Sequence, residues 1–426
     1  MKRIGKYEIS RLLGEGATSE VYLGFDPFAQ REVAIKRLHP ETLRGPTRSV
    51  LYRHLLLNEA ALAGKLRHPH IVQIHDAVID EREAYVVMEY VPGGTLDAFT
   101  RPDGLLPFER LIEIIFKCTR ALDYAYLQGV THRDIKPANI LLGAQEGQDI
   151  KVSDFGAALF TASEATEVSG LGSPAYMSPE QVREMPVDHR TDIYSLGVVM
   201  YQLLTGRLPF DASSKVNMAY QIAHLEAPPA ISVRPEIPVE LDAIVARAMR
   251  RDISERYGTW MEFSHDLAQA YRNRGLGLSR GEPPDSEKFE RLRAFRFFRE
   301  FSDIEIWEIV RFAEWRLIEP EAVVMKEGEP GNYFCFVIQG KLRIVKQGHL
   351  LNVLSAGDCF GEMALFSAGR GARTASVEAT EQTRILTIRA PALLRASALC
   401  QMHFYKGFLE VLSSRLSMAN SRIASI

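Results

Sequence analysis

The chain contains 426 residues, 46% of them apolar and 25% charged, so it has room for about two to four globular domains and is too long for one small fold. Its 51 basic and 54 acidic residues leave a net charge of −3, which disfavours a nucleic-acid binder that relies on bulk positive charge. The sequence has no apolar run of about 18 residues and no apolar leader, so we expect a soluble, cytoplasmic protein without a membrane span.

The cysteines indicate no covalent framework. All four of them, Cys118, Cys335, Cys359 and Cys400, lie far apart and show neither CxxC pairing nor metal-ligand spacing. We therefore expect reduced and mostly buried thiols.

A polar stretch over residues 272–288 contains three glycines and two prolines, which predicts a linker. Before it, residues 7–92 read as short strands with one helix, and residues 105–270 follow helical periodicity. The predicted division is a bilobal first domain over 1–271, with an N-lobe of about 1–91 and a C-lobe of about 92–271, and a second domain over 289–426.

The second domain begins with apolar residues at intervals of three, which predict an amphipathic helix over residues 289–298 with a basic outer face. Between Val323 and Ile388, short apolar runs alternate with glycines, as in the hairpins of a small barrel. A further helical stretch covers residues 390–416. About ten residues follow it, too few for a helix-turn-helix DNA reader.

The first chemical motif is the glycine-rich segment Gly14–Val21, which lies between two predicted strands, residues 7–13 and 21–25. This context is a hairpin rather than the strand-to-helix turn of a dinucleotide fold. Glycines there let backbone N–H groups approach phosphate oxygens without a Cβ clash. Taken alone, the segment favours a plain tight turn over a phosphate site.

Lys36 ends the apolar strand Val33–Lys36, where its ammonium group needs phosphates or a carboxylate to neutralise it. Glu59, on a predicted helix over residues 55–66, can supply that carboxylate. Considered singly, each of these two residues is better interpreted as an ordinary surface charge.

Two later motifs carry carboxylates suited to phosphoryl transfer. Within His132–Asn139, Asp134 could accept a proton from an attacking hydroxyl, Lys136 could neutralise the transferred phosphoryl group, and Asn139 could ligate magnesium. Asp154, in the sequence Asp-Phe-Gly after a short strand, offers a second hard oxygen ligand for Mg²⁺.

Ser178-Pro179-Glu180 follows these motifs along the chain. Because the motifs occur in the family's order and at its spacing, residues of about 7–270 resemble the eukaryotic-type Ser/Thr protein kinases. The resemblance implies a bilobal kinase fold that uses ATP with Mg²⁺ or Mn²⁺. It implies four catalytic residues: Asp134, Lys136, Lys36 and Glu59. It implies an ATP site formed by Gly14, Glu15, Gly16, Ala17, Val21, Ala34, Lys36, the gatekeeper Met88, and the hinge residues Glu89 and Val91. It implies metal ligation by Asn139 and Asp154, and structural roles for Asp192 and for Arg256 paired with Glu180.

Lys136 follows the Ser/Thr kinase pattern, so the substrate hydroxyl implied is that of serine or threonine in proteins. The chain departs from the family at Ser19, Ser173 and Ser178, which stand where glycine, threonine and alanine are usual. None of these changes removes a charge that transfer requires, so we prefer an active enzyme to a pseudokinase scaffold.

Arg133 next to Asp134 is the family feature associated with phosphate control of the activation loop. The phosphorylation candidates are Thr166, which we favour, and Ser169. As an alternative to phosphorylation, the carboxylates of Glu164 and Glu167 supply negative charge in this loop without modification.

Near the end of the barrel region, Glu362 and Arg373 stand on either side of a short segment. A carboxylate can accept hydrogen bonds from ribose hydroxyls and a guanidinium matches phosphate oxygens, although an isolated pair of this kind is usually a surface ion pair.

Their surroundings, residues of about 295–412, resemble the cyclic-nucleotide-binding domain. By this resemblance Glu362 binds the ribose 2′-OH and Arg373 the cyclic phosphate, with Arg370 as a competitor for the phosphate. The implied site comprises Gly361, Glu362, Met363, Ala364, Arg373 and Thr374. Base rates favour cyclic AMP over cyclic GMP.

The sequence thus predicts an α+β multidomain protein: a bilobal kinase fold followed by a cyclic-nucleotide-binding β-barrel with flanking helices. The predicted function is ATP-dependent phosphorylation of protein substrates and of the chain itself, modulated by a cyclic nucleotide. The alternative is an active kinase whose C-terminal domain has lost the nucleotide and serves for docking or oligomerisation. We expect no nucleic-acid partner, and a homodimer is compatible with the sequence.

Overall fold

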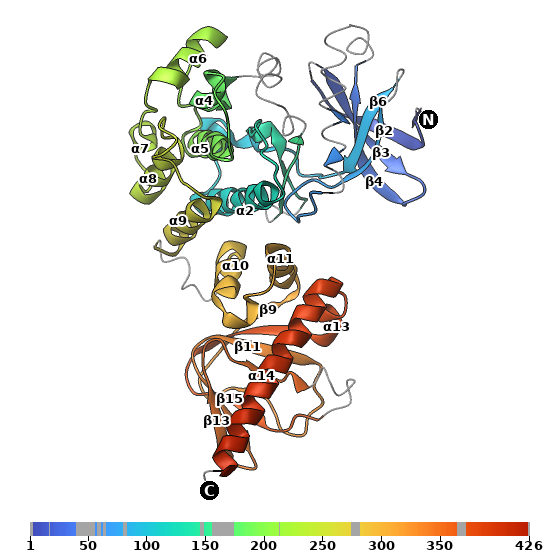
Figure 1. The fold of residues 1–426 in the computed structure, drawn as a ribbon, viewed down its shortest axis with the longest axis vertical. Helices are drawn as coiled ribbons and strands as arrows, with labels where there is room; N and C mark the ends of the chain where they lie inside the picture. Colours follow the sequence, from blue (N-terminus) through green and yellow to red (C-terminus); the bar gives the residue numbers. More distant parts are fainter. Residues whose placement is uncertain are drawn as a thin grey trace. The chain divides into compact units, whose positions relative to one another are not determined.

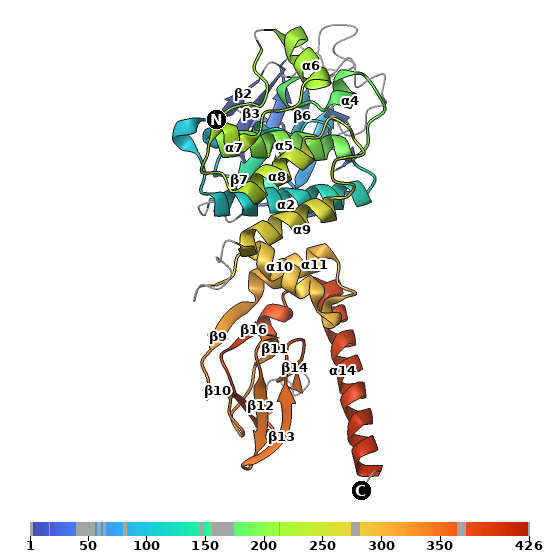
Figure 2. The same ribbon diagram turned by 90° about the vertical axis from the view of Figure 1, so that its left-hand side faces the viewer.

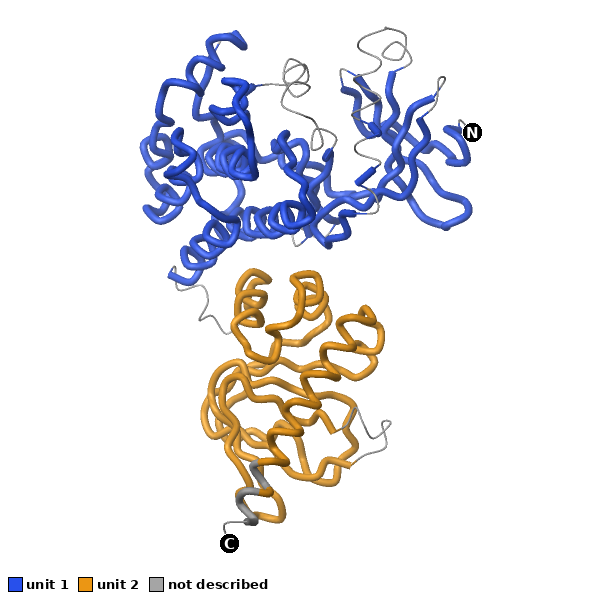
Figure 3. The backbone as a smooth tube through the Cα atoms, viewed as in Figure 1, with its two compact units in different colours: residues 1–273 blue, residues 274–426 orange. Residues whose placement is uncertain are grey.

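The structure is a computed structural model that describes residues 3–16, 18–39, 56–57, 61–62, 65–79, 83–144, 149–155, 174–212, 214–273, 282–363 and 372–424. The chain divides into two compact units, residues 1–273 and 274–426 (Figure 3). Among the helices so described, none combines the length and hydropathy of a membrane-spanning segment. The following site candidates fall outside the described residues: Ala17, Glu59, Glu164, Thr166, Glu167, Ser169, Ala364 and Arg370.

The first unit begins with an antiparallel sheet of six strands in the order β1-β2-β3-β4-β6-β5 (Figure 1). The strands are β1 (Arg3–Ile4), β2 (Tyr7–Glu15), β3 (Ser19–Asp26), β4 (Arg31–Leu38), β5 (Ile74–Ile79) and β6 (Ala84–Glu89).

Alternation along β4 determines where its lysine lies. Val33 and Ile35 pack into the apolar cluster on one face of the sheet, whereas Ala34 and Leu38 belong to the cluster on the other face. Because successive side chains of a strand point to opposite faces, Lys36 shares the face of Ala34 and Leu38.

The second part of the first unit is helical (Figures 1 and 2). Its elements are α2 (Phe108–Leu127), the hairpin β7 (Ile140–Leu142) and β8 (Ile150–Val152), α4 (Pro179–Val182), α5 (Arg190–Thr205), α6 (Lys215–His224), α7 (Ala230–Val233), α8 (Val239–Ala248) and α9 (Trp260–Asn273). Helix α2 packs against α5 and α9 and is buried along most of its length. This core supports the short β7–β8 hairpin, which borders the candidate site.

The second unit contains two four-stranded sheets, in the orders β10-β15-β12-β13 and β14-β11-β16-β9. Its strands are β9 (Glu314–Ile318), β10 (Val323–Met325), β11 (Tyr333–Gln339), β12 (Leu342–Lys346), β13 (His349–Leu354), β14 (Cys359–Phe360), β15 (Ser376–Ala379) and β16 (Thr383–Arg389). Its helices are α10 (Asp285–Ala294), α11 (Asp303–Phe312), α13 (Ala390–Leu393) and α14 (Ala398–Ala424), the last of which extends along the unit in Figure 2.

Strand β11 is buried on both faces. Cys335 and Val337 point into the core between the sheets, whereas Phe334 and Phe336 face an aromatic cluster. That cluster also includes Phe297, Phe298, Phe301, Phe404 and Phe408. Helix α14 is therefore held against the barrel at its N-terminal end by aromatic contacts.

Three helix boundaries differ from the sequence prediction. The helix expected over residues 289–298 ends at Ala294, because Phe295 takes an extended conformation and a 3₁₀ turn follows at Arg296–Phe298, which carries Phe297 and Phe298 into the aromatic cluster. The stretch 390–416 is split between α13 and α14. Helices α9 and α10 also occupy both ends of the predicted linker.

The four cysteines are free and buried, as their spacing led us to expect. Burial raises the pKa of every one of these thiols, to about 12 for Cys335 and Cys359.

Candidate functional site

The glycine-rich segment forms a hairpin turn, as predicted. Strand β2 ends at Glu15, β3 begins at Ser19, and the Gly16 N–H donates to the Ser19 carbonyl at 2.8 Å. A Cβ added to Gly14 would meet nothing within 4 Å, so the backbone there is open to an approaching group. Val21, opposite Gly14 in the register, packs against the same apolar cluster as Ala34 and Met88.

Lys36 forms an ion pair with Asp154, which lies 118 residues further along the chain. Burial acts to raise the pKa of the Asp154 carboxyl, but the charge of Lys36 and its hydrogen bond outweigh burial and hold this pKa below its ordinary value. Asp154 has φ +65°, in the left-handed region that residues with a Cβ seldom adopt. Such strain is often retained at functional sites. The predicted partner Glu59 lies outside the described residues.

Asp134, Lys136 and Asn139 gather in one loop. Lys136 Nζ lies 2.7 Å from Asp134 Oδ2. Asn139 Nδ2 donates to the backbone carbonyl of Asp134 at 2.8 Å and to the carboxylate oxygen Asp134 Oδ2 at 3.2 Å. Because the amide nitrogen of Asn139 is directed at Asp134, its Oδ1 is the atom with which it could ligate a cation.

The backbone of this loop is anchored from α5. Asp192 accepts the backbone N–H of His132 at 2.6 Å and of Arg133 at 2.7 Å. Burial raises the pKa of the Asp192 carboxyl despite these bonds. Ser153, just before Asp154, contacts the loop at both of its ends. The Ser153 carbonyl lies 2.8 Å from His132 Nε2, and the Ser153 N–H donates to the Asn139 carbonyl at 2.9 Å. The two carboxylate-bearing segments are therefore held against each other.

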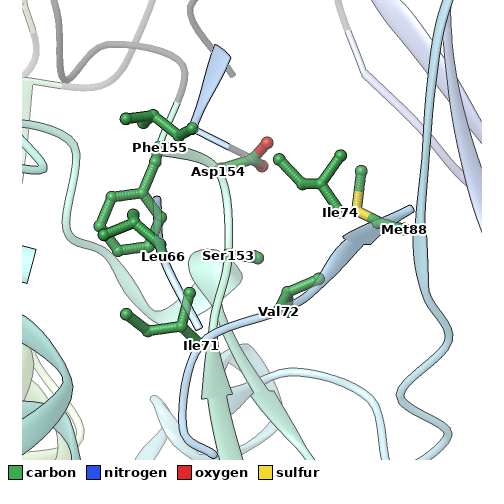
Figure 4. Close-up of a pocket in the computed structure, with 9 residues that line it drawn as sticks. Leu66, Ile71, Val72, Ile74, Met88, Ser153, Asp154 and Phe155 are labelled. Carbon is green, nitrogen blue, oxygen red and sulfur yellow. The ribbon is translucent and has the colours of Figure 1, made fainter. Parts of the chain in front are cut away.

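A small cavity of about 20 Å³ is bordered by Met88 on one side (Figure 4). Its walls are mostly apolar, and the Asp154 side chain borders it together with Phe155 and Ile74. Of the two residues predicted to form the hinge, Val91 packs against the neighbouring apolar cluster. Glu89 directs its N–H to the Gln73 carbonyl at 2.8 Å and its carboxylate to Lys151 at 2.9 Å.

The donor set fits magnesium-bound ATP. Asp154 and Asn139 offer hard oxygen atoms, which Mg²⁺ prefers, and Lys36 and Lys136 bring two cations to the same place. Within the described ranges, no cluster of three or more His, Cys, Asp or Glu side chains forms a closed cage for a metal. A magnesium ion that takes its other ligands from phosphates and water needs no such cage.

The second unit contains a cavity of about 180 Å³ between the β10 and β14 edges of the barrel and α14. It brings together five predicted residues, Gly361, Glu362, Met363, Arg373 and Thr374. The sixth, Ala364, and the competitor Arg370 lie outside the described residues.

Arg373 is nearly buried and is held by neutral groups. Its Nη1 donates to the Gly361 carbonyl at 3.1 Å, its Nη2 donates to the Tyr333 carbonyl at 2.8 Å, and its guanidinium carbon lies 4.6 Å from the centre of the Tyr333 ring. A Cβ on Gly331 would lie 2.4 Å from that carbon, so only glycine allows the arginine to lie there. The cation has no carboxylate among these partners, which suits a site for an anion.

Glu362 has a partner that we did not predict. Arg415 of α14 donates from Nη1 to Glu362 Oε1 at 2.7 Å and from Nη2 to the Cys359 carbonyl. Glu362 is 5% exposed at its side chain, and Arg415 lines the same cavity. The sequence placed Arg415 only on a helix, without any spacing that would link it to Glu362.

Comparisons with known proteins match a different family to each of the two compact units. Residues 7–268 match the family model of the protein kinase domain, and residues 315–398 match that of the cyclic nucleotide-binding domain. The serine/threonine-protein kinase PknB of Mycobacterium leprae is 37% identical over 290 residues, which cover 66% of this chain and 44% of that protein. A probable serine/threonine-protein kinase of Streptomyces coelicolor is 38% identical over 286 residues, which cover 65% of this chain and 41% of that protein. The matched regions thus cover less than half the length of these relatives.

Proposed function

We propose, from the premise that this chain belongs to the protein kinase family, that it transfers the γ-phosphoryl group of ATP to serine and threonine hydroxyls of proteins, itself included. The observation that carries the proposal is the gathering of Asp134, Lys136 and Asn139 in one loop, joined through Ser153 to the Lys36–Asp154 pair.

Each residue has a task that its geometry allows. Asp134 orients the substrate hydroxyl and accepts its proton, while Lys136, 2.7 Å away, stabilises charge on the transferred group. Lys36 binds the α- and β-phosphates once a nucleotide competes with Asp154 for its ammonium group. Asp154 and Asn139 would hold the Mg²⁺ or Mn²⁺ that accompanies ATP, and the metal would lower the electrostatic cost of charge on the phosphates.

Replacing Asp134 by asparagine tests this assignment. We expect Asp134→Asn to retain binding of Mg-ATP and to lose phosphoryl transfer, because the amide cannot accept the proton. Incorporation of radioactive phosphate into a generic protein substrate, with Mg-ATP and with Mn-ATP, is the measurement. Asp103→Asn, the same chemical change in an exposed turn, is the control. Substantial residual transfer would exclude Asp134 as the base, and an inactive wild type would favour the pseudokinase reading.

We further propose that the second unit binds a cyclic nucleotide, cyclic AMP by preference, and that occupancy modulates the kinase. Support comes from the family match and from a cavity in which an arginine with neutral partners and a buried glutamate lie together. Thr374 lines this cavity and is the residue where a preference for cyclic GMP would arise.

The charges around the cavity indicate how a bound nucleotide would affect the position of α14. Arg373 and Glu362 together are neutral, so an anionic ligand would leave an excess negative charge in a poorly hydrated site. Arg415 cancels that charge, and the ligand-bound state therefore favours α14 in its docked position. Since couplings between sites are typically about 1–3 kcal/mol, we expect graded modulation rather than an all-or-none switch.

Thermal melting tests the ligand, and a truncation tests the coupling. We expect either cyclic nucleotide to stabilise the wild type, Arg373→Ala to abolish that effect and Arg370→Ala to keep most of it. Reversal of these two results would reassign the phosphate site. Kinase activity of the full chain should respond to nucleotide, whereas that of residues 1–273 should not. Unchanged melting in the wild type would instead favour a docking or oligomerisation module.

A further inference from the structure

Gln181 uses both ends of its side-chain amide. It lies in the short helix α4, where Ser178 and Gln181 form a reciprocal capping box: Ser178 Oγ accepts the Gln181 N–H at 3.3 Å, and Gln181 Oε1 accepts the Ser178 N–H at 3.0 Å. The other end of the amide leaves the helix, because Gln181 Nε2 donates to the carbonyl of Arg133 at 2.9 Å. A residue of α4 is thus bonded to the loop that carries Asp134.

The group that Gln181 holds is the peptide leading into Asp134. Arg133 has φ +67°, a conformation that a side chain with a Cβ disfavours. Its N–H is fixed by Asp192 Oδ1 at 2.7 Å and its carbonyl by Gln181. Because a peptide group is planar, fixing that carbonyl also fixes the direction of the Asp134 N–H, which donates to His132 Nδ1 at 3.2 Å.

Helix α4, which carries the donor of the Gln181–Arg133 hydrogen bond, is itself held by several polar contacts. Ser178 Oγ lies 2.5 Å from Thr191 Oγ1, and Thr191 donates to Glu180 Oε1 at 3.0 Å. Glu180 in turn forms a buried pair with Arg256 through two hydrogen bonds of 2.7 and 2.8 Å. The amide of Gln181 therefore projects from a short helix that is tied to α5 and to the loop before α9.

We propose that Gln181 is a positioning residue for phosphoryl transfer: its amide N–H group holds the Arg133–Asp134 peptide in the orientation that points the Asp134 carboxylate at the substrate hydroxyl. The proposal rests on the kinase function proposed above. It assigns Gln181 a task distinct from capping, since capping uses Oε1 and positioning uses Nε2. The segment between Asp154 and Ser178 leads directly into α4, so Gln181 also connects the catalytic loop to the end of that segment.

Two substitutions separate the two tasks. Gln181→Glu keeps an oxygen for the capping box, in which glutamate is a preferred residue, but removes the donor to the Arg133 carbonyl. Ser178→Ala removes the side-chain cap and keeps the amide of Gln181. We expect Gln181→Glu to lower kcat about tenfold, equivalent to ~1.4 kcal/mol, with KM for ATP unchanged. We expect Ser178→Ala to lower Tm by about 2–4 °C while kcat remains close to that of the wild type.

Hydrogen exchange of the nucleotide-free full chain adds a readout that needs no activity. The amides of His132, Arg133 and Asp134 should exchange faster in Gln181→Glu and remain protected in Ser178→Ala. Equal kcat in Gln181→Glu and the wild type, or an equal loss of kcat in both variants, would overturn the proposal. If the wild type transfers no phosphate, the proposed function fails, and the exchange data still decide whether Gln181 holds the loop: unchanged protection in Gln181→Glu would refute it.

Discussion

Two arginine–glutamate pairs, one in each unit, differ in how firmly the arginine is held. In the first unit Arg256 is fully buried against Glu180, which is 8% exposed at its side chain. Arg256 makes two hydrogen bonds to that carboxylate and donates to the carbonyls of Arg190, Arg250 and Arg251. In the second unit the glutamate, Glu362, is equally buried, but its partner Arg415 keeps 34% of its side chain exposed.

The difference separates a permanent contact from a reversible one. Backbone carbonyl groups, in place of water, accept the remaining hydrogen bonds of Arg256. Removal of Arg256 from its site would therefore leave both charges and several carbonyls without partners. Arg415 retains access to solvent, and its departure would leave the Glu362 carboxylate and the Cys359 carbonyl beside a cavity that water can enter. The first pair ties α4 to the rest of its unit, whereas the second is suited to respond to a charged ligand.

The largest effect that would test this comparison is on stability. We expect Arg256→Ala to lower the free energy of unfolding of the first unit by about 3–5 kcal/mol, because it leaves a buried carboxylate unpaired. We expect Arg415→Ala to lower that of the second unit by less, about 1 kcal/mol in the absence of ligand, because Glu362 borders a cavity that water can enter once Arg415 is gone. Urea unfolding of the full chain, followed by hydrogen exchange in each unit, is the measurement. Similar losses from both substitutions would contradict the distinction.

A smaller effect concerns ligand affinity. We expect Arg415→Ala to weaken cyclic-nucleotide binding about tenfold, or ~1.4 kcal/mol, because the occupied site then carries an excess negative charge. Lys406→Ala is the matched control, since Lys406 also lies on α14 and pairs at 2.6 Å with Glu300 outside the cavity. Calorimetric titration gives both dissociation constants. Tighter binding in Arg415→Ala would show that Arg415 competes with the ligand instead.

The smallest effect is a dependence on pH. Burial acts to raise the pKa of Glu180, but the hydrogen bonds and charge of Arg256 outweigh it and hold the pKa below the ordinary 4.5. The pair therefore contributes stability in full above pH 4.5, and this contribution is lost as the pH falls through the folded-state value. In Arg256→Ala burial is opposed by the Thr191 hydrogen bond but no longer by the charge of Arg256, so the gap in Tm between the wild type and the variant should narrow on acidification. A constant gap between pH 7 and pH 4 would show that the pair is not the cause.

Local patterns predicted the gathering of the kinase motifs and missed the contacts between distant segments. The apolar run before Lys36 indicated a strand, and the spacing of Asp134, Lys136 and Asn139 indicated that these three residues share a loop. The residue roles remain predictions. The pairing of Lys36 with Asp154 and that of Arg415 with Glu362 join residues 118 and 53 positions apart, and such contacts arise from packing rather than from local pattern. The break at Phe295 has the same origin, since the aromatic cluster overrides helical periodicity.

The buried cysteines have a practical consequence. Because burial raises the pKa of Cys118, Cys335, Cys359 and Cys400, little of any thiol is present as the reactive thiolate at neutral pH. The folded chain should therefore be nearly inert to maleimides and mild oxidants. A single cysteine introduced at an exposed position such as Leu409 of α14 could then carry a fluorescent or spin label while the native thiols remain in place.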